Sequence, residues 1–280
     1  MSETVNRPRL AVRKTYKLFV GGKFPRSESG RTYLVQDSNV SLASRKDVRD
    51  AVVAARAAVK GWAGATAYNR GQILYRVAEM LEGRRDQFVA LGCSVSEVDE
   101  AIDRWVWYAG WSDKITQVYG SANPVAGPYF NLSSPEQTGV VGIVAPADSA
   151  LLGLVSVIAP AIVTGNTVVV LAAEQAPLAA ITLAEVLATS DLPGGVVNLL
   201  TGRAAETAPW LASHADVNAL DLAGVTDPEL ARSLEEAAAG TLKRVLRPSA
   251  AGPVDWTADP GLGRMKSFLE MKTVWHPKGV

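Results

Sequence analysis

Three segments in the first half of the chain place apolar residues three or four positions apart, the period of an amphipathic helix. The first begins at Ser44, and Asp47 at the third helical position completes the pattern of a capping box. The second covers about residues 69–85 and the third about residues 94–119. Their apolar faces are Val48, Val52, Ala55 and Val59; Ile73, Leu74, Val77, Met80 and Leu81; and Ile102, Trp105, Tyr108, Ala109 and Trp111.

Two other segments carry the signals of β-structure. Residues 17–35 place β-rich runs around Gly21-Gly22 and a polar turn at Ser27–Gly30, which predicts a β-hairpin. Residues 118–140 lack helical periodicity and contain Pro124, Pro128 and Pro135. We expect these residues to form an extended arm that pairs at its edges.

From residue 139 onward, short apolar runs alternate with helical stretches. Strands separated by helices of this length form right-handed crossovers and a parallel sheet. The expected fold class is therefore α/β, with a Rossmann-like parallel sheet and helices on both faces. Strands are expected at 139–145, 167–171, 195–200, 217–222 and 242–246, and helices at 150–163, 178–189, 205–213 and 228–240.

The chain is expected to divide near residue 248. Residues 1–248 would form one domain of the nucleotide-binding type, with the arm at 118–140. Residues 249–280 would form a loop-like linker and a C-terminal tail, and the stretch Lys266–Trp275 has apolar residues on both faces of a strand. Because such a strand needs a partner, we expect the arm and the tail to reach outward and pair with another chain.

Composition and charge exclude several classes of function. The 28 basic and 28 acidic residues cancel and form no long block of one sign, which argues against nucleic-acid binding. The stretch Leu151–Val163 is shorter than the ~20 apolar residues of a membrane span. One cysteine cannot form an internal disulfide, and residues 1–17 lack an apolar signal core, so a cytoplasmic location is expected. His214 and His276 lie far apart and near no cysteine, so no metal site is expected.

Several ordered blocks run along the chain: KLFVGGKF at 17–24, VDEAIDRWVWYAGWSDKI at 98–115, TGVVGIVAP at 138–146, APAIVTGNTVVV at 159–170, AEQAPL at 173–178, DLPGGVVNLLTG at 191–202 and LGRMKSFLEMKTVWH at 262–276. In this order they resemble the aldehyde dehydrogenase superfamily. The family's catalytic domain, with its nucleophilic Cys, would lie before the tail, where this chain has only a short segment, so the resemblance implies that this domain is absent. The similarity is greatest to the truncated, non-catalytic C-terminal module of the two-module (family 16) members.

The resemblance also shows which family site residues are replaced. Asp148 stands where the family has an Asn that donates to the developing oxyanion, and an ionised carboxylate cannot donate. Leu171 replaces a Lys that binds the adenosine ribose, and Val225 replaces a Ser that contacts phosphate. The Gly-rich turn has become Arg203, Ala204 and Ala205, and the segment of the general base has become Pro248, Ser249, Ala250 and Ala251.

No catalytic residue is therefore expected. Glu174, Gly202 and Gly224 remain as vestigial cofactor-binding residues, and no cofactor is expected, with weak NAD(P) binding as the alternative. Glu174 has a second interpretation, as an acid that interacts with the dipole of the helix that follows it. Asp148 could be a functional acid, but an N-cap is the common role of Asp at a strand-to-helix junction.

Two further candidates have structural interpretations that we favour. Cys93 could be a relocated nucleophile, but a buried, inert thiol explains it better. The cluster of Trp105, Trp107, Tyr108 and Trp111 could form a ligand cage, but packing explains the helical spacing.

These observations favour a non-catalytic, aldehyde dehydrogenase-like subunit, a pseudoenzyme. It would assemble with itself or with a catalytic aldehyde dehydrogenase, and it would bind neither nucleic acid nor a membrane. Two alternatives stay open: an NAD(P)-dependent aldehyde oxidoreductase that uses other groups, and a regulatory subunit that binds nucleotide without chemistry.

Overall fold

A parallel sheet forms the centre of the molecule, and the computed structural model describes residue 10, residues 12–250 and residues 252–279. Residues 1–9 and Ala251, which entered the expectations about a signal segment and the general base, lie outside this part. The sheet has the strand order β10-β9-β6-β7-β8, and every pairing in it is parallel. Its strands are β6 (Val140–Val144), β7 (Thr167–Leu171), β8 (Val197–Leu200), β9 (Ala219–Asp221) and β10 (Arg244–Leu246).

Helices cover both faces of this sheet, because its strands are apolar on both sides. Val141 and Ile143 of β6 belong to one core cluster, and Val140 and Val144 belong to a second cluster on the opposite face. This arrangement confirms the predicted α/β fold class. The crossover helices are α6 (Leu152–Val163), α7 (Pro177–Leu187), α8 (Ala204–Ser213) and α9 (Pro228–Ala239).

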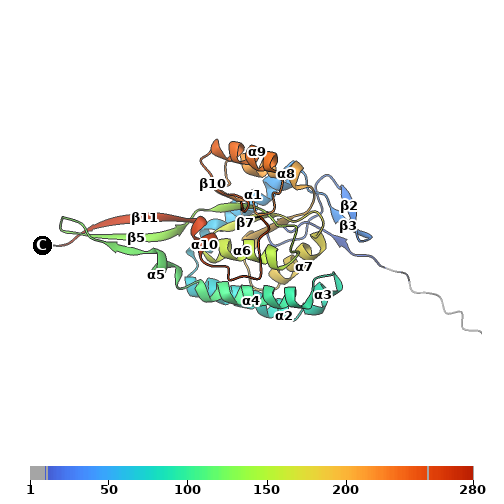
Figure 1. Cartoon of the computed structure of the whole chain (residues 1–280), viewed down its shortest axis with the longest axis horizontal. Helices are drawn as coiled ribbons and strands as arrows, with labels where there is room; N and C mark the ends of the chain where they lie inside the picture. Colours follow the sequence, from blue (N-terminus) through green and yellow to red (C-terminus); the bar gives the residue numbers. More distant parts are fainter. Residues whose placement is uncertain (1–9, 11, 251, 280) are drawn as a thin grey trace, which may run out of the picture.

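The N-terminal helices add to these layers. Helix α1 (Arg45–Gly64) packs against the sheet beside α8, while α2 (Ala67–Glu82) and α4 (Val95–Trp111) lie outside α6 (Figure 1). The prediction of one helix over 94–119 was wrong in its C-terminal part. Helix α4 ends in i→i+3 bonds at Ser112 and Lys114, and α5 (Ile115–Tyr119) follows as a separate turn. A short helix, α3 (Arg85–Ala90), was not predicted.

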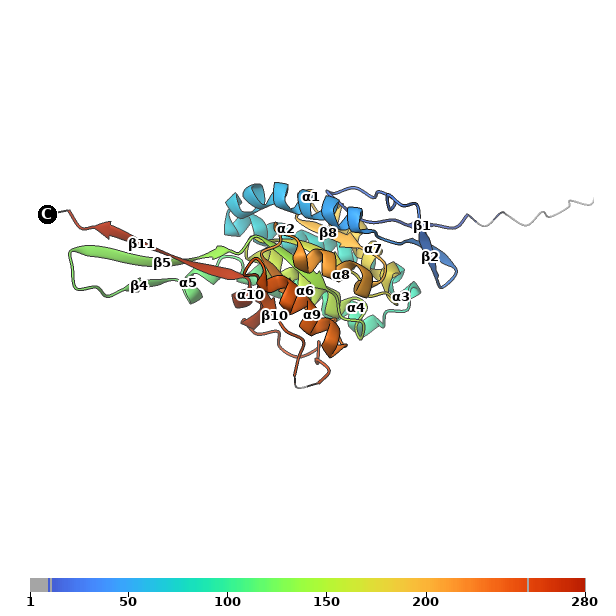
Figure 2. The ribbon, with the colours of Figure 1, turned by 90° about the horizontal axis from the view of Figure 1, so that it is seen from above.

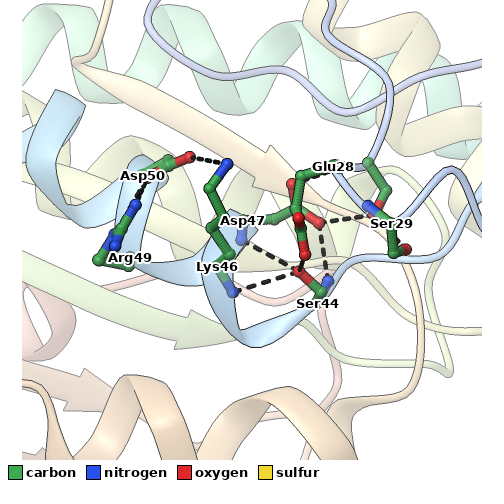
Figure 3. Close-up of polar contacts among 8 residues, drawn as sticks. Glu28, Ser29, Ser44, Lys46, Asp47, Arg49 and Asp50 are labelled. Atoms are coloured by element: carbon green, nitrogen blue, oxygen red, sulfur yellow. Dashed lines mark hydrogen bonds and ion pairs between the residues drawn. The ribbon is translucent and has the colours of Figure 1, made fainter.

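The capping box predicted at Ser44 is confirmed and carries a larger network (Figure 3). The Ser44 hydroxyl accepts from the backbone N–H of Asp47, and the Asp47 carboxylate accepts from the backbone N–H of Ser44 at 2.8 Å. The same carboxylate accepts from the Ser27 hydroxyl at 2.7 Å and from the Glu28 backbone N–H at 3.1 Å. The cap therefore joins the start of α1 to the preceding polar turn.

The hairpin predicted over 17–35 is partly wrong. The turn at Gly21-Gly22 forms, since Val20 and Lys23 exchange backbone hydrogen bonds. However, β2 (Thr32–Val35) pairs antiparallel with β3 (Ser38–Ser41), and β1 (Thr15–Tyr16) pairs with β3 on its other side. A two-residue turn with positive φ at Gln36 and Asp37 joins β2 to β3, the geometry that fits the twist of a tight hairpin.

The arm and the tail form a second, separate sheet with the order β11-β5-β4. Strand β5 (Tyr129–Gln137) pairs antiparallel with β11 (Leu269–Pro277) over the whole length of both, and β4 (Ser121–Asn123) pairs with the other edge of β5. The expectation that the arm and the tail each lack a partner within the chain was therefore wrong: each is the other's partner. Figures 1 and 2 show this sheet extending away from the body, with the C-terminal end of β11 near its tip.

The base of the tail is anchored in the body. Helix α10 (Gly263–Ser267) buries Met265, and Phe268 is buried immediately after it. The Asn166 side chain donates to the Phe268 carbonyl at 2.9 Å and also accepts from the Gly139 backbone N–H at 2.7 Å. One buried amide therefore joins β6, β7 and the start of β11.

Residues 247–262 connect β10 to α10 and contain neither helix nor strand among their described residues. The segment nevertheless packs on the body, because Trp256 is only 8% exposed and joins the core cluster of α4 and α6. None of the helices formed by the described residues combines the length and the apolar composition needed to cross a membrane.

Candidate functional site

The main candidate site is a hollow of about 750 Å³ at the carboxyl ends of β6 and β9. In an open α/β sheet, ligands bind at these ends where the strand order reverses, and here the order reverses between β6 and β9. The loops after β6, β9 and β10 and the start of α9 surround the hollow. Its lining includes Pro146, Asp148, Gly224, Val225, Pro248, Ser249 and Trp256.

Asp148 faces this hollow and accepts a hydrogen bond of 3.0 Å from the indole N–H of Trp256. The prediction that Asp148 caps the next helix was wrong. Helix α6 begins only at Leu152, and Glu97 of α4 caps it instead by accepting from the backbone N–H groups of Leu151 and Leu152 at 2.9 and 3.3 Å. The hydrogen bond from Trp256 means that Asp148 instead holds the segment that carries Trp256.

Gly224 also lies at the hollow, and the packing of the protein alone explains its lack of a side chain. Its backbone N–H donates to the Val144 carbonyl at 2.9 Å, and a Cβ atom here would lie 2.0 Å from the Ala145 carbonyl oxygen. The neighbouring Val225 is buried and belongs to the core cluster of α1 and α8. Gly224 is therefore required where the turn after β9 crosses the end of β6.

Glu174 and Gly202 lie beyond the ends of β7 and β8 and do not line the same hollow. Glu174 pairs with Arg203 at 3.7 Å, and both side chains are about half exposed, so this pair adds little stability. Gly202 has φ +135°, and a Cβ atom there would lie 3.0 Å from the Leu42 side chain. Of the predicted cofactor residues, Gly224 therefore lines the hollow, whereas Glu174 and Gly202 lie outside it.

Tyr33 of β2 lies beside Glu174 and Gly202. Burial and, next, the nearby Glu174 carboxylate raise the pKa of the Tyr33 hydroxyl, so it stays protonated. Glu174 carries no side-chain hydrogen bond to the start of α7, whose N-cap is Ala176.

The hollow has a suitable place and size for part of a dinucleotide, but its donors do not suit the phosphates. The side chain of Leu171 is buried in the core and carries no charge. Helix α9 starts with Pro228, which has no N–H, and the Asp227 carboxylate accepts from the Glu229 N–H at 3.0 Å. Two arginines at the rim already pair with acids: Arg232 with Glu236 and Arg247 with Glu235, at 3.0 and 2.7 Å.

Cys93 is buried between α3 and α4, and burial, followed by the charge of Glu97, raises the pKa of its thiol to about 11. A thiol with this pKa is a poor nucleophile near neutral pH, as the inert interpretation expects. His276 is exposed on β11, and His214 Nδ1 accepts from the Asp216 backbone N–H at 3.2 Å. Within the described residues, no group of three or more His, Cys, Asp or Glu side chains could hold a metal ion.

The aromatic cluster of α4 packs as predicted. Trp105 and Tyr108 are fully buried, and the rings of Trp107 and Trp111 lie 5.6 Å apart. Sequence reasoning missed Arg104, which is buried on the same helix face, although its spacing from Ala101 and Trp105 placed it there. It also missed the buried pair of Asp221 and Arg264.

The sheet, its switch point and this hollow define an α/β protein with a nucleotide-domain architecture. A model of the aldehyde dehydrogenase family matches residues 36–247. The chain therefore belongs to the aldehyde dehydrogenase family.

The chain's relatives agree with this assignment. Aldehyde dehydrogenase, cytosolic 1 of Elephantulus edwardii is 33% identical over 274 residues, which cover 90% of this chain and 54% of that protein. Retinal dehydrogenase 2 of Homo sapiens is 33% identical over 261 residues, which cover 85% and 49%. The NAD+ complex of an aldehyde dehydrogenase from Bacillus cereus has a TM-score of 0.77 at 26% identity and covers 83% of this chain and 50% of that one. The chain thus spans about half the length of the relatives it matches.

Proposed function

We propose that this chain is a non-catalytic subunit of the aldehyde dehydrogenase family that assembles with itself or with a catalytic aldehyde dehydrogenase. Its nearest functional counterpart would be the truncated C-terminal module of the family 16 members, and it would act in the cytoplasm. In this proposal the body up to residue 248 is the scaffold, and the arm together with residues 249–280 is the assembly element.

The observation that carries the proposal is the exposed apolar surface of the sheet β11-β5-β4. Phe130, Met271 and Trp275 are 58%, 51% and 57% exposed on a sheet that projects from the body (Figure 2). Residues paired directly across two strands share a face of the sheet, and successive residues of one strand alternate between faces. Phe130 pairs with His276, which lies an odd number of positions from Met271 on β11, so Phe130 and Met271 lie on opposite faces. Exposed apolar area of this kind on a projecting sheet marks a protein–protein contact.

Three features support the absence of independent catalysis. The Asp148 carboxylate accepts the Trp256 N–H where the family uses an Asn as an oxyanion donor. The only cysteine is buried and its pKa is raised, so a thiolate nucleophile is scarce. Pro248, Ser249 and Ala250 offer no carboxylate in the segment that carries the general base in the family.

The test is steady-state NAD(P)H production by the purified chain with short and long aldehydes. We expect no rate above the uncatalysed reaction. Turnover that Cys93→Ala abolishes would overturn the non-catalytic proposal and support the oxidoreductase alternative.

A second candidate, a nucleotide-binding regulatory subunit, is supported by the hollow at the switch point of the sheet. Bound NAD(P) would lie against Gly224 and the start of α9 and would act as an effector only. Because Leu171 and Val225 lack polar side-chain donors, we expect weak or no binding, each such loss typically costing ~1–3 kcal/mol. Calorimetry with NAD and NADP tests this, and micromolar affinity for either would favour the regulatory function.

A further inference from the structure

A second, smaller hollow of about 110 Å³ lies where α4 and α6 meet the segment before α10. It offers roughly the volume of three to four water molecules, so it admits only a ligand of a few heavy atoms. Its polar lining comes from different elements: Arg104 and Tyr108 from α4, Ser156 from α6 and Arg264 from α10.

Arg104 brings to this hollow a buried positive charge that forms no ion pair among the described residues. Its side chain is only 8% exposed and donates to the carbonyls of Trp256 and Ala258, at 2.7 and 3.0 Å, and to the Ser156 hydroxyl at 3.3 Å. All three acceptors are neutral, and no carboxylate in the described part of the chain lies within 4.0 Å of the guanidinium. A guanidinium has five N–H donors, which leaves two for another acceptor. Buried charges are normally paired, so an anion would complete this site.

Tyr108 adds a donor that has no partner. Its side chain is fully buried, and its hydroxyl makes no hydrogen bond within the described residues. Burial raises the pKa of this hydroxyl, so it stays protonated and able to donate. Ser156, which is also buried, accepts from Arg104 and keeps its own proton for a further acceptor.

The surrounding charges favour an anion with a single negative charge. Arg264 also lines the hollow, but the buried Asp221 carboxylate offsets its charge. Two exposed carboxylates, Asp255 and Asp259, also line the hollow, and loop N–H groups engage them: Asp255 accepts from Thr257, and Asp259 accepts from Gly261. These charges would repel a dianion more strongly than a monoanion.

The acids of a neighbouring hollow that Arg104 also lines add to this repulsion. Glu100 and Asp103 line it together with Arg104. The acids around the site therefore oppose a ligand of charge −2.

We propose that the hollow of Arg104, Tyr108 and Ser156 binds a small monocarboxylate of formate or acetate size. The carboxylate oxygens accept from the free Arg104 donors and from the two hydroxyls. The Trp256 and Ala258 carbonyls hold the same guanidinium in place for the ligand.

Calorimetry of the full-length chain with sodium acetate, formate and phosphate tests this site, each against sodium chloride at equal ionic strength. We expect saturable binding of one acetate or formate and weaker binding of phosphate. Tyr108→Phe keeps the ring and removes only the donor, so it should fold and bind about tenfold more weakly. Arg104→Gln should abolish binding.

Tyr33→Phe is the matched control, since it also removes a buried tyrosine hydroxyl, but one that lies beside Gly202 and does not line this hollow. It should bind like the unmodified chain. The proposal is overturned if acetate and formate give no saturable binding, if phosphate binds more tightly, or if Tyr108→Phe binds as well as the unmodified chain. If Arg104→Gln does not fold, the Tyr108→Phe result decides.

Discussion

The indole N–H of Trp256 donates to the Asp148 carboxylate at 3.0 Å, across more than a hundred residues of sequence. The contact holds the segment between β10 and α10 against the loop that follows β6. Trp256 is largely buried there, with the Arg264 guanidinium 5.3 Å from the centre of its ring. The family resemblance would place a catalytic domain in this segment. Here the segment instead packs near the carboxyl end of β6.

Trp256→Ala should lower the free energy of unfolding by about 3–5 kcal/mol, because it removes a large buried side chain and leaves a cavity. Urea unfolding followed by circular dichroism measures this change. Trp210→Ala is the matched control, since Trp210 is 42% exposed and contacts Arg45 by a cation–π interaction. It should cost about 1 kcal/mol or less. Equal losses in the two variants would show that the segment is not docked.

Arg264→Met should destabilise the chain by about 3–5 kcal/mol near neutral pH, because it leaves the buried Asp221 carboxylate without its cation. Burial raises the pKa of the Asp221 carboxyl, and Arg264 opposes this effect. Without Arg264 the folded state holds the proton more tightly than the unfolded state. The stability of the variant should then rise as the pH falls from about 8 to about 5.

Urea unfolding at several pH values tests this prediction. The double variant Asp221→Asn/Arg264→Met has no carboxyl at this position and should lose the added pH dependence. A single variant whose free energy of unfolding does not rise on acidification relative to that of the double variant would contradict the prediction.

Cys93 should react slowly with a thiol reagent in the folded chain. A thiol pKa of about 11 leaves roughly 100-fold less thiolate near pH 8 than a pKa of about 9, and burial slows access further. The rate of disulfide exchange with Ellman's reagent, measured with and without urea, tests this, with Cys93→Ser as the blank. Equal rates in both conditions would place the thiol at an accessible surface.

Most of the fold could be predicted from the sequence because the strands and helices after residue 139 carry strong local patterns. Strand β7 begins and ends where expected, since its β-branched run follows Gly165-Asn166 and gives way after Leu171 to two alanines and then to Glu174. The capping box at Ser44 was predictable for the same reason, because its two partners, Ser44 and Asp47, lie only three residues apart.

The pairing of β5 with β11 was not predictable in this way. It joins residues more than a hundred positions apart, and the alternation of each strand fits a partner from the same chain or from another. The same reason explains the error at Asp148, whose partner is the distant Trp256. The error in the first hairpin has a different cause, because β2 pairs with its near neighbour β3 across the Gln36-Asp37 turn, while the prediction relied on the glycines at Gly21-Gly22.

The candidate site was predicted only in part. Gly202 and Gly224 stand out in the sequence, but the contacts that require them, with Leu42 and with Ala145, appear only in three dimensions. Arg104 could have been placed on a buried helix face from its spacing. Two of its three neutral acceptors could not be predicted, because the carbonyls of Trp256 and Ala258 belong to an irregular segment.

Sedimentation velocity of the intact chain, alone and mixed with a catalytic aldehyde dehydrogenase, tests the proposed assembly most directly. We predict an oligomer or a mixed complex that Trp275→Glu dissociates without loss of the helical circular dichroism signal, because Trp275 lies exposed on β11. Tyr75→Glu, on α2 and 51% exposed, is the matched control and should leave the assembly intact. An intact chain that sediments as a monomer both alone and in the mixture, or an assembly that Trp275→Glu leaves unchanged, would contradict the proposal.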